Sequence, residues 1–372
     1  MRISGRKAVG HCLFAALLAV CLALPVGAWS QGTGRPLLLG VNVVWGDGGG
    51  TAGFDRDGRA DRLLDWMTSA GVTNTRLGVG WDLSDSGKGD YDWGDFDTLV
   101  RRVRARGIEV VACVAGTPEF ARDPDPRVRE LFEREKQTHL LSVTPPVPER
   151  LADFERWAET LVARYRPLVK RWELWNEQDG MGMPLWERDP SGVPVRIRWG
   201  GDPRLYADML KHFHRAAKRA DPDCIVIVGG LQVPDTKFIE GLYAADAGAY
   251  FDAVGLHPYT ENSVINTWWI DRVREVLVRH GDGHKPFYLT EYGWHASSAE
   301  TERMQARLLQ ESMQAMLERP FIEQASYHTL NDWRTDEQRP ESLMAMGLLT
   351  RDLKPKAALE TFRSLSRDLS RY

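Results

Sequence analysis

The chain has 372 residues, of which 43% are apolar, and its formal net charge is −4. This near balance of charge excludes the strongly basic class of nucleic-acid-binding proteins, and the apolar content excludes an intrinsically disordered chain. The sequence contains 14 Trp residues, which are rarely buried completely and are suited to a surface that binds flat ligands.

The beginning of the chain has the layout of a secretory signal peptide. A basic start precedes an apolar stretch from Cys12 to Leu24, and small residues follow up to Ala28. The apolar stretch is shorter than the roughly 20 residues that a transmembrane helix needs, and an uncleaved N-terminal membrane anchor is the alternative. We therefore expect residues 1–28 to be a signal peptide, residues 29–372 to form one domain, and the protein to be periplasmic or extracellular.

Short apolar runs alternate with longer amphipathic segments along the rest of the chain. Most of these runs are continuous rather than alternating, which is typical of parallel strands covered on both faces. Eight runs are predicted to be strands: Leu37–Val44, Thr73–Val79, Ile108–Ala115, Lys170–Asn176, Cys224–Leu231, Asp252–His257, Pro286–Glu291 and Gln324–Leu330. The amphipathic segments between them are predicted to be helices, for example Arg59–Ala70, Asp95–Arg106, Pro148–Tyr165 and Ser298–Glu318.

This alternation predicts an α/β protein built as a single (β/α)8 TIM barrel. A doubly wound sheet is disfavoured because no Gly-rich phosphate loop follows an early strand. Two of the strand-to-helix connections are long, over residues 117–147 and 178–201, and the second contains Trp186 and Trp199. In a barrel such loops lie on the face at which the strands end, which is the face that carries active sites.

Two apolar strands end in a glutamate. The fourth predicted strand ends Trp175-Asn176-Glu177, and the seventh ends Thr290-Glu291. The fourth and seventh strands nearly face each other in a ring of eight. Two carboxyl groups that converge from opposite walls are the arrangement that glycoside hydrolysis requires, since one protonates the leaving oxygen and the other attacks the sugar or activates water.

These motifs resemble those of the clan A retaining glycosidases. The Trp-Asn-Glu of the fourth strand and the Thr-Glu-x-Gly-Trp of the seventh are similar to the motifs of that clan, and the likeness extends over almost the whole chain after residue 28. Within the clan, the sequence looks most like family 39, in its bacterial exopolysaccharide or biofilm-polysaccharide hydrolase branch, with family 5 as a competitor. The tail from Gly347 to Ala357 resembles the final strand–helix junction of family 39.

The resemblance implies roles for individual residues. It makes Glu177 the acid/base and Glu291 the nucleophile, with Asn176 bonding the sugar 2-hydroxyl. Strict alternation along a strand would send Asn176 and Glu177 to opposite faces, so the strand must end or bulge there. Arg76 matches the cation that keeps the nucleophile ionised, although it could instead simply pair with a carboxylate of the barrel.

Further residues are expected to bind substrate. By resemblance, His257 and Tyr259 orient the nucleophile or touch the sugar. Trp45 and Trp294 follow strands, where their faces could stack on sugar rings. The eighth strand departs from the clan pattern, which often places a Trp there, so that Tyr327, His328 and Trp333 are all open candidates for the floor of the sugar site.

The sequence thus predicts an exported retaining β-glycosidase that hydrolyses a polysaccharide, with endo action on a bacterial exopolysaccharide favoured by the Trp-rich loops. An exo-acting β-xylosidase-like enzyme and a carbohydrate-binding barrel without catalysis are the alternatives. We expect no cofactor and no metal: His212 and His214 lie in an amphipathic helix without a nearby third ligand. The expected partner is a polysaccharide or oligosaccharide substrate.

Overall fold

The computed structural model describes residues 37–45, 54–55, 58–87, 89–134, 144–180, 186–188, 194–196, 202–333 and 345–371. The predicted signal peptide and Trp199 lie outside the described residues, and Trp186 is described only through its backbone. Among the helices of the described segments, none is both long enough and apolar enough to cross a membrane.

Eight parallel strands close into a barrel in the order β1-β10-β9-β8-β7-β4-β3-β2, which confirms the predicted (β/α)8 fold. Because the ring follows chain order, each barrel strand lies beside its neighbours in the sequence. The barrel strands are β1 (Leu38–Asn42), β2 (Asn74–Gly80), β3 (Glu109–Ala115), β4 (Arg171–Asn176), β7 (Ile225–Leu231), β8 (Ala253–Leu256), β9 (Phe287–Tyr292) and β10 (Ile322–His328). Predicted and observed strand boundaries agree to within two residues.

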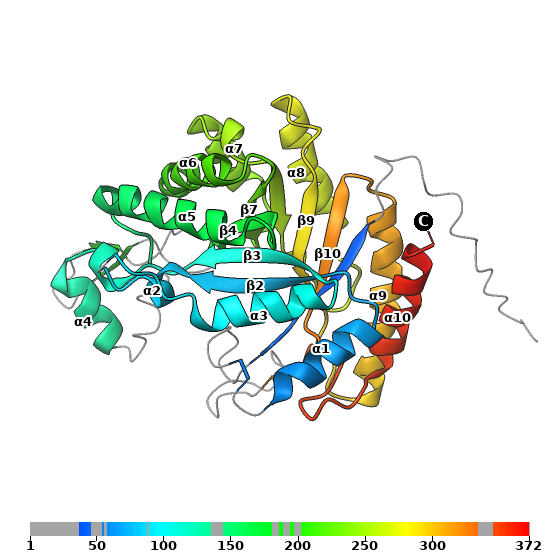
Figure 1. The fold of residues 1–372 in the computed structure, drawn as a ribbon. Coiled ribbons are helices and arrows are strands. Elements are labelled where there is room, and N and C mark those ends of the chain that lie inside the picture. The colour runs from blue at the N-terminus through cyan, green and yellow to red at the C-terminus, as the bar shows by residue number, and fades with distance from the viewer. Residues whose placement is uncertain are drawn as a thin grey trace, which may run out of the picture.

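Helices surround the barrel, as Figure 1 shows. They are α1 (Arg59–Ser69), α2 (Trp81–Ser84), α3 (Gly94–Ala105), α4 (Pro126–Arg134), α5 (Leu151–Tyr165), α6 (Pro203–Ala220), α7 (Lys237–Ala244), α8 (Thr267–Arg279), α9 (Ala299–Leu317) and α10 (Ala357–Leu369). Their starts follow from the sequence: the Asp202 side chain caps α6 ahead of Pro203, and Ser298 and Thr301 form a capping box at α9.

Alternation along the strands separates two layers of core. On β3, Val110, Ala112 and Val114 pack in the large cluster shared with the helices, whereas Val111 belongs to a second cluster with Ile227, Ala253 and Tyr288. Neighbouring strand residues face opposite sides of a sheet, so the second cluster fills the barrel interior. The barrel is therefore a packed core, and a ligand can enter only where the strands end.

The two long connections contain structure of their own. The β3–α5 connection includes α4 and two short 3₁₀ turns, η2 (Glu119–Ala121) and η4 (Pro148–Arg150). In the β4–α6 connection, β5 (Trp186–Arg188) and β6 (Pro194–Arg196) pair antiparallel. A third 3₁₀ turn, η5 (Gly248–Tyr250), precedes β8. In Figure 1, α2 and α4 lie beyond the ends at which β2 and β3 stop.

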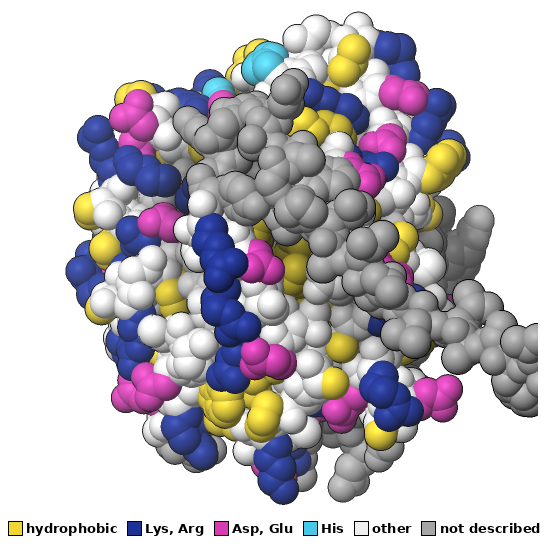
Figure 2. Space-filling view, turned by 90° about the vertical axis from the view of Figure 1, so that its right-hand side faces the viewer, with side chains coloured by type: hydrophobic (Ala, Val, Ile, Leu, Met, Phe, Trp, Pro, Cys, Tyr) yellow, Lys and Arg dark blue, Asp and Glu magenta, His cyan; other side chains and the backbone are white. Residues whose placement is uncertain are grey.

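Charges of both signs are mixed on the face of the molecule drawn in Figure 2, and its apolar side chains form only small groups among the described residues. A surface of this kind agrees with the near balance of charge in the sequence. A short column of Lys and Arg side chains runs down the middle of the described part of this face, and Asp and Glu side chains lie directly beside it.

Candidate active site

The end of β4 brings two neighbouring side chains to the same side. The backbone of Trp175 has φ 72° and that of Glu177 has φ 52°, both in the left-handed region, so that the alternation of a strand is broken. The backbone N–H of Glu177 donates to the carbonyl of Gly230 on β7 at 3.0 Å. Glycine at position 230 leaves room for the site, because a Cβ there would lie 2.0 Å from Nε2 of His257. The predicted interruption of the strand is therefore present, and both Asn176 and Glu177 contact site residues.

Glu291, on β9, lies among groups that favour its charged form. Nη1 of Arg76 donates to its Oε1 at 2.8 Å, and the Tyr259 hydroxyl donates to its Oε2 at 2.9 Å. Nδ1 of His257 and Nδ1 of His328 each lie 3.8 Å from Oε2. Burial alone would raise the pKa of Glu291, but the charges of His257, His328 and Arg76 and the Tyr259 hydrogen bond lower it to about 2.

Arg76, on β2, connects three walls of the barrel. Its guanidinium donates to Glu173 on β4, to Glu291 on β9 and, at 2.7 Å, to Oδ1 of Asn176. Burial works against this cation, but neighbouring anionic groups outweigh burial and raise its pKa. Arg76 thus pairs with a buried barrel carboxylate, Glu173, and also with Glu291, and its role towards the proposed nucleophile stays a prediction.

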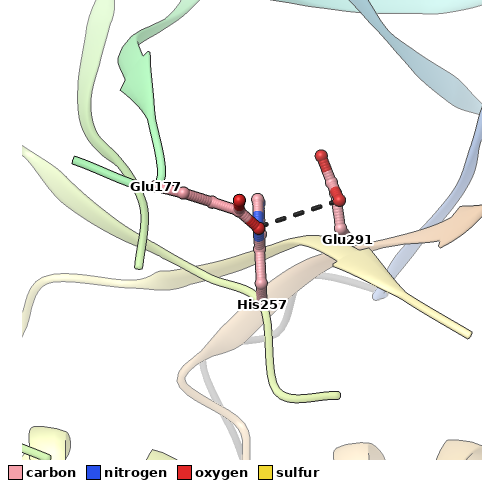
Figure 3. A group of neighbouring side chains, drawn as sticks. All are labelled: Glu177, His257 and Glu291. Atoms are coloured by element: carbon pink, nitrogen blue, oxygen red, sulfur yellow. Dashed lines mark hydrogen bonds and ion pairs between the residues drawn. The ribbon is translucent and has the colours of Figure 1, made fainter. Parts of the chain in front are cut away.

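The carboxyl groups of Glu177 and Glu291 lie close to each other, and the imidazole of His257 lies next to both of them (Figure 3). One oxygen of each glutamate and one ring nitrogen of His257 all lie within 4.8 Å of one another. Nδ1 of His257 is 3.0 Å from Oε1 of Glu177, and its Nε2 is 3.1 Å from Oγ1 of Thr290. Burial opposes the imidazolium, yet the two carboxylates raise the pKa of His257.

A cavity of about 320 Å³ opens beside Glu291. Its lining includes polar groups from β1, β2, β4 and β10, with Trp45 and Trp333 as its aromatic members. Oδ1 of Asn42 and Nε1 of Trp45 are buried and have no hydrogen-bond partner within the described structure. Because both atoms are shielded from solvent, the polar groups that the cavity offers to a ligand are those of Arg76, Asn176, Glu291 and His328.

The candidates from the eighth strand take different places. His328 and Trp333 line the cavity, and their rings meet edge to face with centroids 5.4 Å apart. Tyr327 is fully buried and packs against Tyr292 and Trp294. Trp294 is buried too, with its indole N–H donated to the Ser263 carbonyl, so its predicted contact with sugar stays a prediction.

Other tryptophans separate into packing and exposed positions. Trp81 and Trp157 are buried and pack against each other, with ring centroids 6.1 Å apart and ring planes tilted by 35°. Trp269 is buried and donates to the Asp235 carbonyl. Trp268, in the first turn of α8, is 65% exposed on the face where the strands end.

Sequence reasoning missed several groups of the site. Glu173 is completely buried and accepts from the backbone N–H of Gly230 at 2.8 Å and the hydroxyl of Thr290 at 2.7 Å, besides Arg76. Asn42 donates to the Thr290 carbonyl and lies 3.3 Å from Nδ1 of His328. A carboxylate within an apolar strand was the available signal for Glu173, since such a charge demands a buried partner.

The histidines of the amphipathic helix α6 have other partners. Nδ1 of His212 contacts Glu155, and His214 packs against Tyr250. The spacing of Glu177, His257 and Glu291 would permit a cation. The guanidinium of Arg76 already neutralises Glu291, and its positive charge would repel a metal ion there.

Comparison with known proteins points to one class of enzyme. Residues 226–354, which include His257, Tyr259 and Glu291, match the family model described as a glycosyl hydrolase catalytic core. No curated protein matches the chain. The matched segment is about a third of the chain and contains one of the two facing glutamates.

Solved structures share the barrel at low sequence identity. A family 39 glycoside hydrolase from Bacteroides cellulosilyticus WH2 is 20% identical with a TM-score of 0.65, over 89% of this chain and 64% of its own. A family 39 β-xylosidase from Caulobacter crescentus is 18% identical with a TM-score of 0.67, over 91% and 73%. Xylanase 10B from Thermotoga petrophila RKU-1 is 15% identical with a TM-score of 0.60, over 89% and 94%. These similarities establish the fold.

Proposed function

We propose that the protein is a retaining β-glycosidase of the clan A type. The observation that carries the proposal is the pair of glutamates, Glu177 and Glu291, which end facing strands and bring carboxylate oxygens within 4.8 Å of each other beside a cavity. A retaining mechanism needs carboxyl groups about 5–5.5 Å apart, whereas inversion needs about 6.5–9.5 Å to admit a water molecule. The short separation supports retention.

In this proposal the two glutamates have different tasks. Glu291, whose pKa is about 2, is ionised and attacks the anomeric carbon to form a covalent glycosyl-enzyme. Glu177 gives a proton to the departing glycosidic oxygen and then takes one from the water that releases the sugar. Arg76 and Tyr259 hold the Glu291 carboxylate in place, and Asn176 bonds the sugar 2-hydroxyl.

A neutral part of a polysaccharide is the substrate that fits the cavity. Arg76, Asn176 and His328 offer polar groups to sugar hydroxyls, while the rings of Trp45 and Trp333 provide apolar faces. A second cavity of about 330 Å³, lined by Gly80, Trp93 and Asp95 among others, lies near the end of β2. Exposed Trp268 adds an aromatic face on the side where the strands end. These features support endo action on an extended chain, which we propose to be a bacterial exopolysaccharide.

Of the two alternatives, exo action has support from the comparisons. The structural likeness to a β-xylosidase and to an exo-β-1,4-mannosidase favours exo action, in which single sugars leave a chain end. A carbohydrate-binding barrel without catalysis would also need the cavity, but it would not need an ionised Glu291 beside Glu177. Export through the predicted signal peptide is part of the main proposal and suits a substrate outside the cell.

Hydrolysis of a polysaccharide panel tests the proposal. The protein is incubated with neutral bacterial exopolysaccharides, xylan and mannan, and the products are followed by size and by ¹H NMR of the first anomer formed. We expect early mixed oligosaccharides with the β configuration retained. Single sugars from the start would replace endo with exo action, an α anomer would exclude retention, and binding without hydrolysis by wild-type protein would leave the carbohydrate-binding barrel.

A further inference from the structure

Thr290 lies between a carboxylate and an imidazole, and its one proton can serve only one of them. Its hydroxyl is 2.7 Å from Oε1 of Glu173 and 3.1 Å from Nε2 of His257. Glu173 is paired with Arg76 and accepts from Gly230, and an ionised carboxylate can only accept hydrogen bonds. The Thr290 hydroxyl therefore donates to Glu173, which leaves its oxygen to accept from His257.

This direction fixes the tautomer of His257. Because Thr290 accepts, Nε2 of His257 must carry a hydrogen atom. Neutral histidine then has only a lone pair at Nδ1, which faces Oε1 of Glu177 at 3.0 Å and Oε2 of Glu291 at 3.8 Å. A lone pair facing two carboxylates is repulsive, so one more proton must reside between Nδ1 and Glu177.

We propose that Thr290 and Glu173 are positioning residues that force His257 and Glu177 to share one proton, the proton that the leaving group needs. The inference rests on the proposed function for its role in catalysis, but the tautomer of His257 stands apart from that function. The Glu173–Thr290–His257–Glu177 chain runs from the buried interior of β4, through β9 and the end of β8, to the loop after β4.

The shared proton can be followed through both steps of the reaction. With the shared proton on Glu177, its O–H turns from Nδ1 to the glycosidic oxygen and transfers the proton as the bond to the anomeric carbon breaks and the bond to Glu291 forms. His257 is then neutral with its lone pair at Nδ1. In the second step, water forms a bond to the anomeric carbon as the bond from that carbon to Glu291 breaks and Glu291 leaves as a carboxylate, and the proton that the water loses goes to Glu177, which restores the shared state.

The charges around His257 agree with a proton held there. Glu177 and Glu291 lie near its Nδ1, the Tyr259 ring meets the imidazole edge to face, and Arg76 and His328 are the neighbouring basic groups. The two carboxylates outweigh burial and the positive charge of Arg76, which raises the pKa of His257. His328 opposes little, because burial lowers its own pKa.

Replacement of Thr290 by Val, with Ser as the matched control, tests the inference. Val keeps the shape but cannot accept from Nε2, so neutral His257 can move its hydrogen atom to Nδ1 and donate to ionised Glu177. The proton between His257 and Glu177 is then no longer needed to relieve the repulsion between the lone pair and the carboxylate. We therefore expect this proton to dissociate at lower pH than in the wild-type protein. We expect the alkaline limb of kcat/KM to fall by about one pH unit in Thr290→Val, which corresponds to one hydrogen bond to a charged group, and to be unchanged in Thr290→Ser.

Nitrogen NMR of the full chain gives a readout that needs no substrate. With ¹⁵N-labelled histidine, and with His257→Gln to assign the signals, wild-type protein should keep Nε2 protonated at every pH while Nδ1 titrates. Thr290→Val should show the neutral tautomer with hydrogen on Nδ1. A wild-type neutral form protonated on Nδ1, or identical signals in wild type and Thr290→Val, would overturn the inference whether or not the protein hydrolyses a glycoside.

Discussion

The two glutamates at the barrel mouth both follow apolar strands, yet their surroundings differ. Glu291 lies within a ring of donors and cations, with its side chain 13% exposed and its pKa lowered to about 2. Glu177 lies on left-handed backbone with its side chain 31% exposed and meets the imidazole of His257. In the proposed mechanism these surroundings keep Glu291 charged and make Glu177 the proton donor, although the residue type is the same.

Replacement of Glu291, the charged glutamate, should have the largest effect on activity. In Glu291→Gln the amide cannot attack the anomeric carbon, and we expect kcat/KM to fall by at least about 10⁴-fold on every substrate. Initial rates on a polysaccharide and on an aryl glycoside measure this. Glu261→Gln, an exposed change in the loop after β8, is the control. A loss below tenfold would show that Glu291 is not the nucleophile.

The effect of replacing Glu177, the proposed proton donor, should depend on the leaving group of the substrate. Glu177→Gln removes the proton donor, and general acid catalysis contributes about 10²–10⁴-fold. We expect a loss of this size for the polymer and a much smaller loss of the glycosylation rate for a dinitrophenyl glycoside, whose leaving group needs no proton. Pre-steady-state bursts separate the two steps. Equal losses on both substrates would contradict the difference between the two glutamates.

Replacement of Arg76, which pairs with both Glu173 and Glu291, should lower the stability of the fold. Arg76→Met leaves Glu173 and Glu291 buried without their counter-ion, and we expect the free energy of unfolding to fall by about 3–5 kcal/mol. Arg101→Met removes an exposed ion pair with Asp97 and should cost below about 1 kcal/mol. Denaturant unfolding compares the two variants, and similar losses would mean that the Arg76 network contributes no special stability.

Acid should destabilise the wild-type protein through Glu291. Its pKa is lowered from 4.5 to about 2 on folding, so its ionisation contributes stability that is fully present above about pH 4.5 and is lost as pH falls towards 2. The contribution is about 3 kcal/mol. Unfolding free energies between pH 6 and 2 should therefore fall more steeply in wild type than in Glu291→Gln. Parallel curves would contradict the lowered pKa.

The barrel followed from the sequence because its signal is local and repeated. Each strand is a short apolar run, and the ring places consecutive strands side by side, so that Glu177 and Glu291 could be predicted to converge. The break in alternation at Asn176 was predicted from the need for both side chains to reach the site. The left-handed backbone at Trp175 could not be predicted, because Trp has no preference for this conformation.

The network beneath the two glutamates could not be predicted from spacing. Glu173, Thr290 and Asn42 come from β4, β9 and β1, and only the register of the closed barrel brings them together. A Thr in an apolar strand has no signature of a proton relay. Arg76 was identified through its motif, but its pairing with Glu173 as well as Glu291 follows from a guanidinium that can donate in several directions.

The two cysteines of the barrel domain have a consequence for redox chemistry. Cys113 lines the cavity, and Cys224 immediately precedes β7. Both are buried and free, and burial raises the pKa of each thiol to about 12. At neutral pH only about one such thiol in 10⁵ is thiolate, the form that oxidants attack. Peroxide or a disulfide catalyst should therefore leave both sulfurs reduced, so that the domain tolerates an oxidising compartment without a single cross-link.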